Sequence, residues 1–99
     1  GMVLANGEGV AKNEAEAAKW MRKAAKQGHP DAQYNLGLML RNGQGVAKNE
    51  VEAVKWIRKA VEQRYAKAQF SLGFMLAHGR GVAKNEVEAV KWIRKAVEQ

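Results

Sequence analysis

The chain has 99 residues, enough for one domain, and its 46% hydrophobic and 27% charged residues are typical of a folded protein rather than a disordered one. It contains no cysteine, which excludes disulfides, thiolate metal sites and a cysteine nucleophile, and its apolar runs are too short to predict a membrane span. The net charge of +7 favours anionic partners without distinguishing acidic proteins, nucleic acids or lipid headgroups.

The sequence repeats itself with a period of 36 residues. The segment GVAKNEVEAVKWIRKAVEQ stands at 45–63 and again, unchanged, at 81–99, and residues 9–27 match it at 14 of 19 positions. A fixed period of this length indicates a protein built by stacking one structural unit. We expect a single repeat domain over 1–99, whose first repeat is truncated at its N-terminus. The expected repeats are 1–27, 28–63 and 64–99.

The first helix expected in chain order begins after Asn13, because Asn13 and Glu16 form an asparagine version of the capping box. In this motif the Asn side chain accepts a hydrogen bond from a free N–H of the first turn, a contact worth ~1 kcal/mol. The same pair recurs as Asn49 with Glu52 and as Asn85 with Glu88.

The next helix is expected from about 31 to 42, with its counterpart near 67 to 78. Pro30 suits the first helical position, where its missing N–H costs nothing. Gly37 lies inside the helix, where glycine costs ~1 kcal/mol relative to alanine. That cost is tolerable if the missing side chain lets a neighbouring helix approach closely. Gly43 is expected to end the helix in a left-handed conformation.

The helix expected at 50–63 is amphipathic, because its apolar residues fall in an arc of roughly 160°. The arc contains Ala53, Val54, Trp56, Ile57, Ala60 and Val61. We expect Trp56 and its equivalents Trp20 and Trp92 to be buried, so that Trp56→Ala costs ~3–5 kcal/mol.

The short link at 43–48 makes consecutive helices antiparallel neighbours. One such hairpin cannot bury both of its apolar stripes, so successive hairpins must stack on a shared core. The expected fold is therefore an all-α solenoid of about three antiparallel helix–turn–helix repeats.

Nothing in the sequence indicates a catalytic, metal or cofactor site. The Gly-x-Gly turns follow no strand and precede no Gly-Lys-Ser/Thr, which disfavours a phosphate loop. His29 and His78 occupy different repeat positions, Ser71 is the only serine, and threonine is absent. A nucleophile, base and orienting group would have to converge by accident, so we expect no enzyme and no cofactor.

The strings AQYNLGLMLRNGQGVAKNEVEAVKWIRKA and AQFSLGFMLAHGRGVAKNEVEAVKWIRKA resemble Sel-one-like repeats, relatives of the tetratricopeptide repeat. The resemblance covers essentially the whole chain. It implies a right-handed superhelix with first helices on the concave side and second helices on the convex side, and a role as adaptor or scaffold.

Three features depart from the family pattern. Leucine replaces the usual tyrosine at Leu4, Leu40 and Leu76. The turn glycine Gly28 becomes Arg64 in the next repeat, so we expect the backbone of that junction to be strained. The cysteine pairs of the family branch noted for penicillin binding are absent, so that activity is not carried over.

The best candidate site is the face of the first helices that points away from the Leu36 and Leu40 stripe, here called the outer face. The resemblance places this face in the concave groove. Aromatic and apolar residues there are mixed with polar neighbours that differ between repeats, a pattern that suits a docked peptide or protein. The candidate residues are Asp31, Tyr34, Leu38, Arg41, Asn42, Lys67, Phe70, Phe74, Ala77 and His78. The alternative is that Tyr34 and Phe70 seal the joints between repeats.

A second hypothesis uses a basic stripe on the second helices to bind RNA or an acidic polymer. The stripe contains Lys19, Arg22, Lys23, Lys26, Lys55, Arg58, Lys59, Lys91, Arg94 and Lys95. Nucleic-acid grooves usually add aromatic residues for base stacking, and we expect none on this face, which disfavours nucleic acid. The uncapped ends of the array also predict possible end-to-end self-association.

Overall fold

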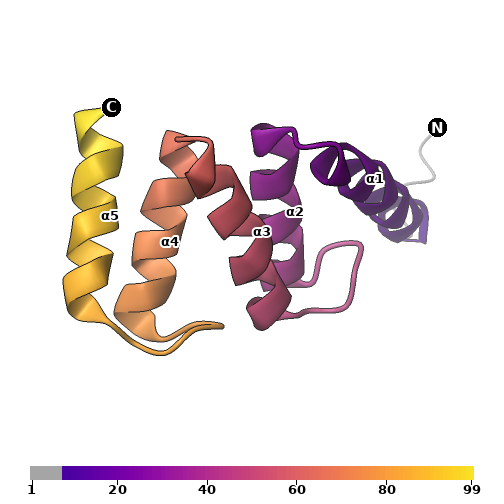
Figure 1. Ribbon diagram of the computed structural model, residues 1–99. Helices are drawn as coiled ribbons and strands as arrows, with labels where there is room; N and C mark the ends of the chain where they lie inside the picture. Colours follow the sequence, from indigo (N-terminus) through magenta and orange to yellow (C-terminus); the bar gives the residue numbers. More distant parts are fainter. Residues whose placement is uncertain (1–7) are drawn as a thin grey trace.

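The computed structural model describes residues 8–99, with side chains from Asn13 onward, and shows five α-helices in this range. In chain order they are α1 (Glu8–Lys26), α2 (Pro30–Asn42), α3 (Glu50–Glu62), α4 (Ala66–His78) and α5 (Glu86–Glu98). Each helix packs against its neighbours in the chain, giving an array of 47 × 26 × 20 Å (Figure 1). The expected all-α solenoid is confirmed.

The ends of the helices follow the local sequence signals. Pro30 occupies the start of α2, and Gly43 ends that helix in the left-handed conformation with φ 69° and ψ 39°. Gly79 ends α4 in the same way. At the start of α3, the Asn49 side chain accepts a hydrogen bond of 2.9 Å from the backbone N–H of Glu52, and α5 repeats this cap. The caps predicted for the second and third repeats are confirmed.

The cap predicted at Asn13 is wrong, because α1 begins at Glu8 and passes through Asn13 without interruption. In the second repeat, the turn before α3 is fixed when the Asn49 N–H donates to the Leu40 carbonyl at 2.8 Å. The equivalent acceptor in the first repeat is Leu4, which lies outside the described residues. The described backbone of the first repeat instead makes its hydrogen bonds within one continuous helix.

The core lies between the helices, and glycine brings α2 and α3 together. Leu36, Leu40 and Ile57 are fully or almost fully buried. A Cβ atom on Gly37 would lie only 2.6 Å from Ile57 Cγ1 and 3.2 Å from the Ala53 carbonyl oxygen. The close approach expected at Gly37 is therefore confirmed, and Gly73 in α4 meets Ile93 of α5 in the same manner.

The joints between repeats are also close. Gly45 has φ +74°, and a Cβ atom there would overlap the backbone carbonyl of Glu14 in α1. Gly81 meets the carbonyl of Glu50 in the same way. Arg64, which replaces the turn glycine, has φ 62° and is the only described non-glycine residue with positive φ. The junction at Arg64 is therefore strained, as expected.

Side-chain amide hydrogen bonds connect the first repeat to the second. The buried Gln33 donates through Nε2 to the Ala25 carbonyl at 3.2 Å. Gln63 Nε2 donates to Gln33 Oε1 at 3.0 Å and to the Gly28 carbonyl at 2.8 Å. These bonds tie the ends of α1 and α3 to the start of α2. The position of the candidate surfaces described next depends on this fixed stacking.

Candidate functional site

Two phenylalanine rings are exposed on α4. Phe70 is 53% exposed and Phe74 is 44% exposed, one helical turn apart. The Phe74 ring packs against the His78 imidazole with ring centres 4.4 Å apart. Lys67 is exposed beside them and Ala77 is half-buried. Because large aromatic side chains are normally at least partly covered, this cluster of rings is a candidate contact surface.

The equivalent face of α2 is less open. Tyr34 and Leu38 are half-buried, and the Tyr34 ring lies 5.5 Å from that of Tyr65, at the junction with the next repeat. Arg41 Nε donates to Asn42 Oδ1 at 3.5 Å, and Asp31 is exposed. Tyr34 thus helps to seal a joint between repeats, whereas Phe70, its equivalent in α4, is exposed.

The tryptophans are more exposed than their place in the sequence pattern predicts. Trp20 is 64% exposed, with Lys23 Nζ 5.0 Å from its ring centre, so the prediction of a buried Trp20 is wrong. Trp56 and Trp92 are half-buried and pack against the edge of the core. The tryptophan lies at the margin of the apolar arc, where its burial depends on a neighbouring helix. Trp20 is on α1, and no described helix precedes α1 in the chain (Figure 1).

Ion pairs link successive second helices on this face. Arg22 Nη1 contacts Glu52 Oε2 at 2.9 Å, and the same oxygen accepts the Trp56 indole N–H at 3.2 Å. The hydrogen bond from Arg22 holds the pKa of Glu52 below its ordinary value, and the Trp56 N–H acts in the same direction against the opposing effect of desolvation. Arg58 and Glu88 repeat the pair at 3.8 Å. The predicted basic stripe is therefore partly neutralised.

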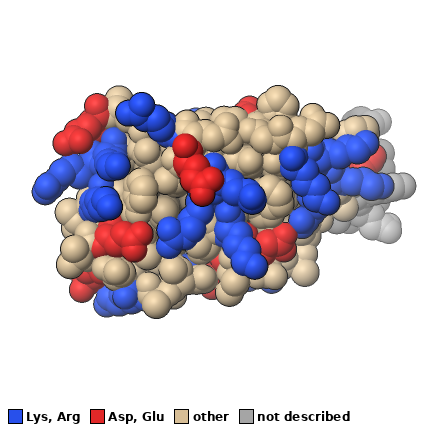
Figure 2. Space-filling model, viewed as in Figure 1, with Lys and Arg blue, Asp and Glu red and all other residues tan. Residues whose placement is uncertain are grey.

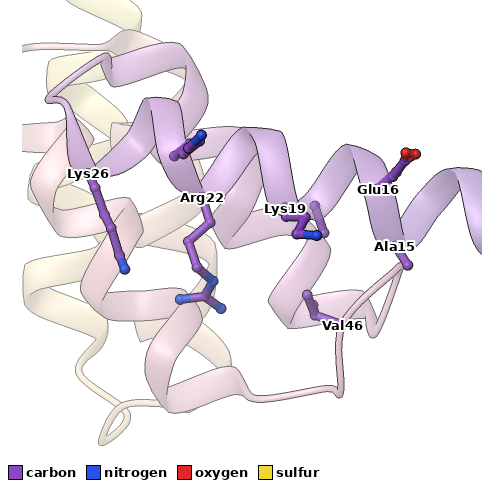
Figure 3. Close-up of a pocket in the computed structure, with 8 residues that line it drawn as sticks. Ala15, Glu16, Lys19, Arg22, Lys26 and Val46 are labelled. Carbon is purple, nitrogen blue, oxygen red and sulfur yellow. The ribbon is translucent and has the colours of Figure 1, made fainter.

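A hollow lies beside α1 that the sequence pattern did not reveal. Lys and Arg gather over α1 at the right-hand end of the molecule (Figure 2). In the close-up, Arg22 and Lys26 extend from α1 over an open space bounded by the turn that carries Val46, while Glu16 points away (Figure 3). Alanine at Ala15 and Ala18, where the second repeat has valine, does not by itself indicate the hollow, because α5 has valine at both equivalent positions and borders a similar hollow.

The outer face of α5 exposes an apolar row. Val90 is 54% exposed and Val97 is 74% exposed, although their sequence equivalents in α3, Val54 and Val61, are buried. The segments 45–63 and 81–99 are identical, so only the neighbouring helix makes the difference. In α3 that neighbour is α4.

The residues suited to bind metals are dispersed. Among the residues that the structure describes, no group of three or more His, Cys, Asp or Glu side chains is placed to hold a metal ion. The same part of the chain has no helix that is both long and apolar enough to cross a membrane.

Stacked antiparallel hairpins with left-handed glycine turns define the molecule as an α-solenoid repeat protein. The sequence profile of the Sel1 repeat matches residues 1–29, 30–65 and 66–99. The chain therefore belongs to the Sel1 repeat family. Proteins of this family generally mediate protein–protein interactions, and the family scaffold is typically non-catalytic.

Three solved structures are similar to this chain. A Sel1 repeat protein from Oxalobacter formigenes shares 39% identity with a TM-score of 0.81, over 83% of this chain and 63% of its own. A protective antigen of uropathogenic Escherichia coli, which displays an SLR fold, shares 46% identity with a TM-score of 0.87, over 95% of this chain and 20% of its own. The cysteine-rich protein B of Helicobacter pylori shares 29% identity with a TM-score of 0.79, over 84% of this chain and 62% of its own.

The chain spans less than two thirds of the length of each of these proteins. Comparison with curated protein sequences gave no match.

Proposed function

We propose that the chain is a non-enzymatic scaffold that binds an amphipathic peptide or protein segment on the outer face of α2 and α4. The observation that carries this proposal is the pair of exposed rings at Phe70 and Phe74. Aromatic side chains supply large contact areas at low entropic cost and often dominate binding energy at interfaces. Their spacing of four residues matches one turn of a helix and therefore the side-chain spacing of a docked helical peptide.

The surroundings of the rings provide selectivity. Lys67 and Arg41 contribute positive charge, and Asp31 contributes one negative charge on α2. Leu38 and Tyr34 extend the apolar surface onto α2, with only part of each side chain accessible. The residues that complete the proposed surface are Asn42, Ala77 and His78. A partner with apolar residues on one face and acidic residues at its margin fits this arrangement.

The test uses a displayed library of amphipathic helical peptides, followed by measurement of the dissociation constant of a selected peptide by fluorescence polarisation. The double variant Phe70→Glu with Phe74→Glu should weaken binding by about tenfold or more, since two anchors are lost. Circular dichroism should show unchanged helicity, because both rings are exposed.

A charge-reversed variant on the other face, Lys55→Glu with Arg58→Glu and Lys59→Glu, is the matched control. It should leave peptide binding within about twofold of the original, since these residues lie on α3 and are not part of the proposed surface on α2 and α4. If the charge-reversed variant loses binding of the selected peptide and the phenylalanine variant keeps it, the surface on α2 and α4 is not the binding site. The RNA-binding alternative would be favoured if the original chain bound oligouridine strongly and in a salt-sensitive way and the charge-reversed variant did not.

Self-association is a second proposal, supported by the exposed valine row on α5. Val90 and Val97 are chemically equivalent to residues that α4 buries on α3. An apolar face of this kind can be covered by another copy of the chain, and a head-to-tail contact can grow beyond a dimer. Light scattering over a concentration series should show the mean mass rising, and Val90→Lys with Val97→Lys should restore a monomer. A constant monomer mass for the original chain refutes this proposal.

A further inference from the structure

The hollow beside α1 has an apolar floor and a basic rim. Its volume is about 530 Å³, and Ala15, Ala18 and Val46 form the apolar part. Ala15 and Ala18 come from α1, whereas Val46 comes from the turn that leads into α3. A volume of this size lies within the range of roughly 300–1,000 Å³ that is usual for ligand sites. Figure 3 shows that the space is open on the side over which Arg22 and Lys26 extend.

The floor of the hollow differs from the equivalent positions of the other two repeats at two residues. The second repeat has Val51 and Val54 where the first has Ala15 and Ala18, while the turn valine is kept. Each alanine lacks the two methyl groups of a valine, so the floor over α1 has fewer side-chain atoms than valine would give it. The equivalent residues of α5, which include Val87 and Val90, also line a hollow, of about 640 Å³, so the substitutions change the floor of the hollow but do not create it.

The rim of the hollow is more basic than the equivalent region of the second repeat. Lys19, Lys23 and Lys26 are exposed around it, and Glu16 is the one acidic residue that lines it. At the position of Lys26 the second repeat has Glu62. Arg22 also lines the hollow, but its guanidinium is paired with Glu52. The three lysines thus supply the cationic groups that a bound anion would contact.

We propose that this hollow binds an acidic peptide segment in which one aliphatic side chain stands between carboxylates. The aliphatic side chain enters the space over Ala15 and Ala18, and the neighbouring carboxylates contact the rim lysines. The charge of the rim requires an anionic partner, and the apolar floor requires an aliphatic group within it. The residues that line the hollow include no aromatic ring, although the exposed Trp20 lies beside the rim lysines Lys19 and Lys23. The test below therefore includes oligouridine as a competing ligand. This site lies on α1 and on the turn between α2 and α3, and it is independent of the surface on the outer face of α2 and α4.

The test measures binding of a fluorescein-labelled peptide, Asp-Glu-Leu-Glu-Asp, at low ionic strength. Ala15→Val with Ala18→Val adds four methyl groups to the floor, and should weaken binding about tenfold because less space is left for the leucine side chain. Lys26→Glu, again the residue of the second repeat, should weaken binding by about threefold to fivefold through loss of a surface ion pair. Ala15→Val alone, at an exposed position, should reduce binding without any change in folding.

Three controls make the result specific. The variant Phe70→Glu with Phe74→Glu should bind the peptide as the original does, so failure of the proposed function and failure of this site give different results. A peptide with glycine in place of leucine, and one with Asn and Gln in place of the acids, should each bind at least about fivefold more weakly. Equal binding of the leucine and glycine peptides, tight binding of oligouridine unaffected by the valine variants, or no binding of the leucine peptide would each overturn the proposal.

Discussion

Replacement of Gly37 by alanine tests how closely α2 and α3 pack. A Cβ atom at Gly37 would lie 2.6 Å from Ile57 Cγ1, about 1 Å inside an ordinary carbon–carbon contact. Alanine gains ~1 kcal/mol over glycine in helix propensity. Against this gain, overpacking in a filled core costs about 1–3 kcal/mol, and forcing Ile57 off its rotamer adds about 1 kcal/mol. We expect Gly37→Ala to destabilise the fold by about 1–3 kcal/mol, since the steric cost exceeds the helical gain.

The equivalent variant Gly73→Ala provides the comparison. Its Cβ atom would meet Ile93 at 2.5 Å, but Ile93 is half-buried on α5, where no described helix covers the outer side. Ile93 can therefore move outward, and the cost should be smaller than that of Gly37→Ala by about 1 kcal/mol. Urea denaturation followed by circular dichroism gives both values from the midpoint and slope.

A double-mutant cycle with Ile57→Ala isolates the contact. Removing Ile57 Cγ1 should abolish most of the steric cost, so that the double variant is more stable than the sum of the single effects by about 1 kcal/mol or more. Equal destabilisation by Gly37→Ala and Gly73→Ala, together with additive behaviour in the cycle, would refute the idea that Ile57 limits the approach of the helices.

Three further variants probe the tryptophans, the strained turn and the ion pair. Trp56→Ala should lower the free energy of unfolding by about 2 kcal/mol, because Trp56 packs against the core and donates to Glu52. Trp20→Ala should lower it by less than about 1 kcal/mol, because Trp20 is exposed. Equal losses in urea denaturation would contradict this expectation. Arg64→Gly should stabilise the fold by about 1 kcal/mol and raise Tm by about 4 °C, because glycine adopts positive φ without steric cost. The matched change Gly28→Ala, at φ +97°, should lower Tm. A lower Tm for Arg64→Gly and a higher Tm for Gly28→Ala would show that the left-handed conformation carries no cost. Glu52→Gln should lower the free energy of unfolding by about 0.5–1 kcal/mol at neutral pH. Because the folded-state pKa of Glu52 lies below 4.5, this difference should be complete above pH 4.5 and disappear as the pH falls through the lowered pKa; a difference that stays constant down to pH 2 would argue against the ion pair with Arg22.

The helices and their turns could be predicted because their signals are local. The 3.6-residue periodicity of 50–63, the proline at the start of α2 and the glycine at its end each act through neighbouring residues. The close approach at Gly37 was also predictable, since glycine inside a helix is costly unless a neighbouring helix occupies the space that its missing side chain leaves. Repetition of the pattern then required stacking, because each hairpin has more apolar surface than it can bury alone.

The features that sequence reasoning missed depend on neighbours in space. The burial of a tryptophan at the margin of an apolar arc is decided by the adjacent helix, so Trp20 and Trp56 differ although their local sequences are similar. The pairing of Arg22 with Glu52 depends on the offset between successive second helices, which a single helical wheel does not contain. The hollow over Ala15 and Ala18 is lined by α1 and by the turn that carries Val46, and the sequence pattern of α1 alone does not place that turn. The wrong start of α1 has a similar origin, since its turn requires a distant carbonyl partner.

The contacts of Gly45 with Glu14 and of Gly81 with Glu50 have a consequence for how such arrays diversify. Both contacts are between backbone atoms of successive repeats. The rotation from one repeat to the next therefore depends little on the other side chains, provided that glycine is kept at the contact. Exposed side chains that make no bond across a joint between repeats can then be exchanged without altering these backbone contacts. A single backbone geometry can therefore present many different surfaces, and new specificity requires only substitutions on the outside.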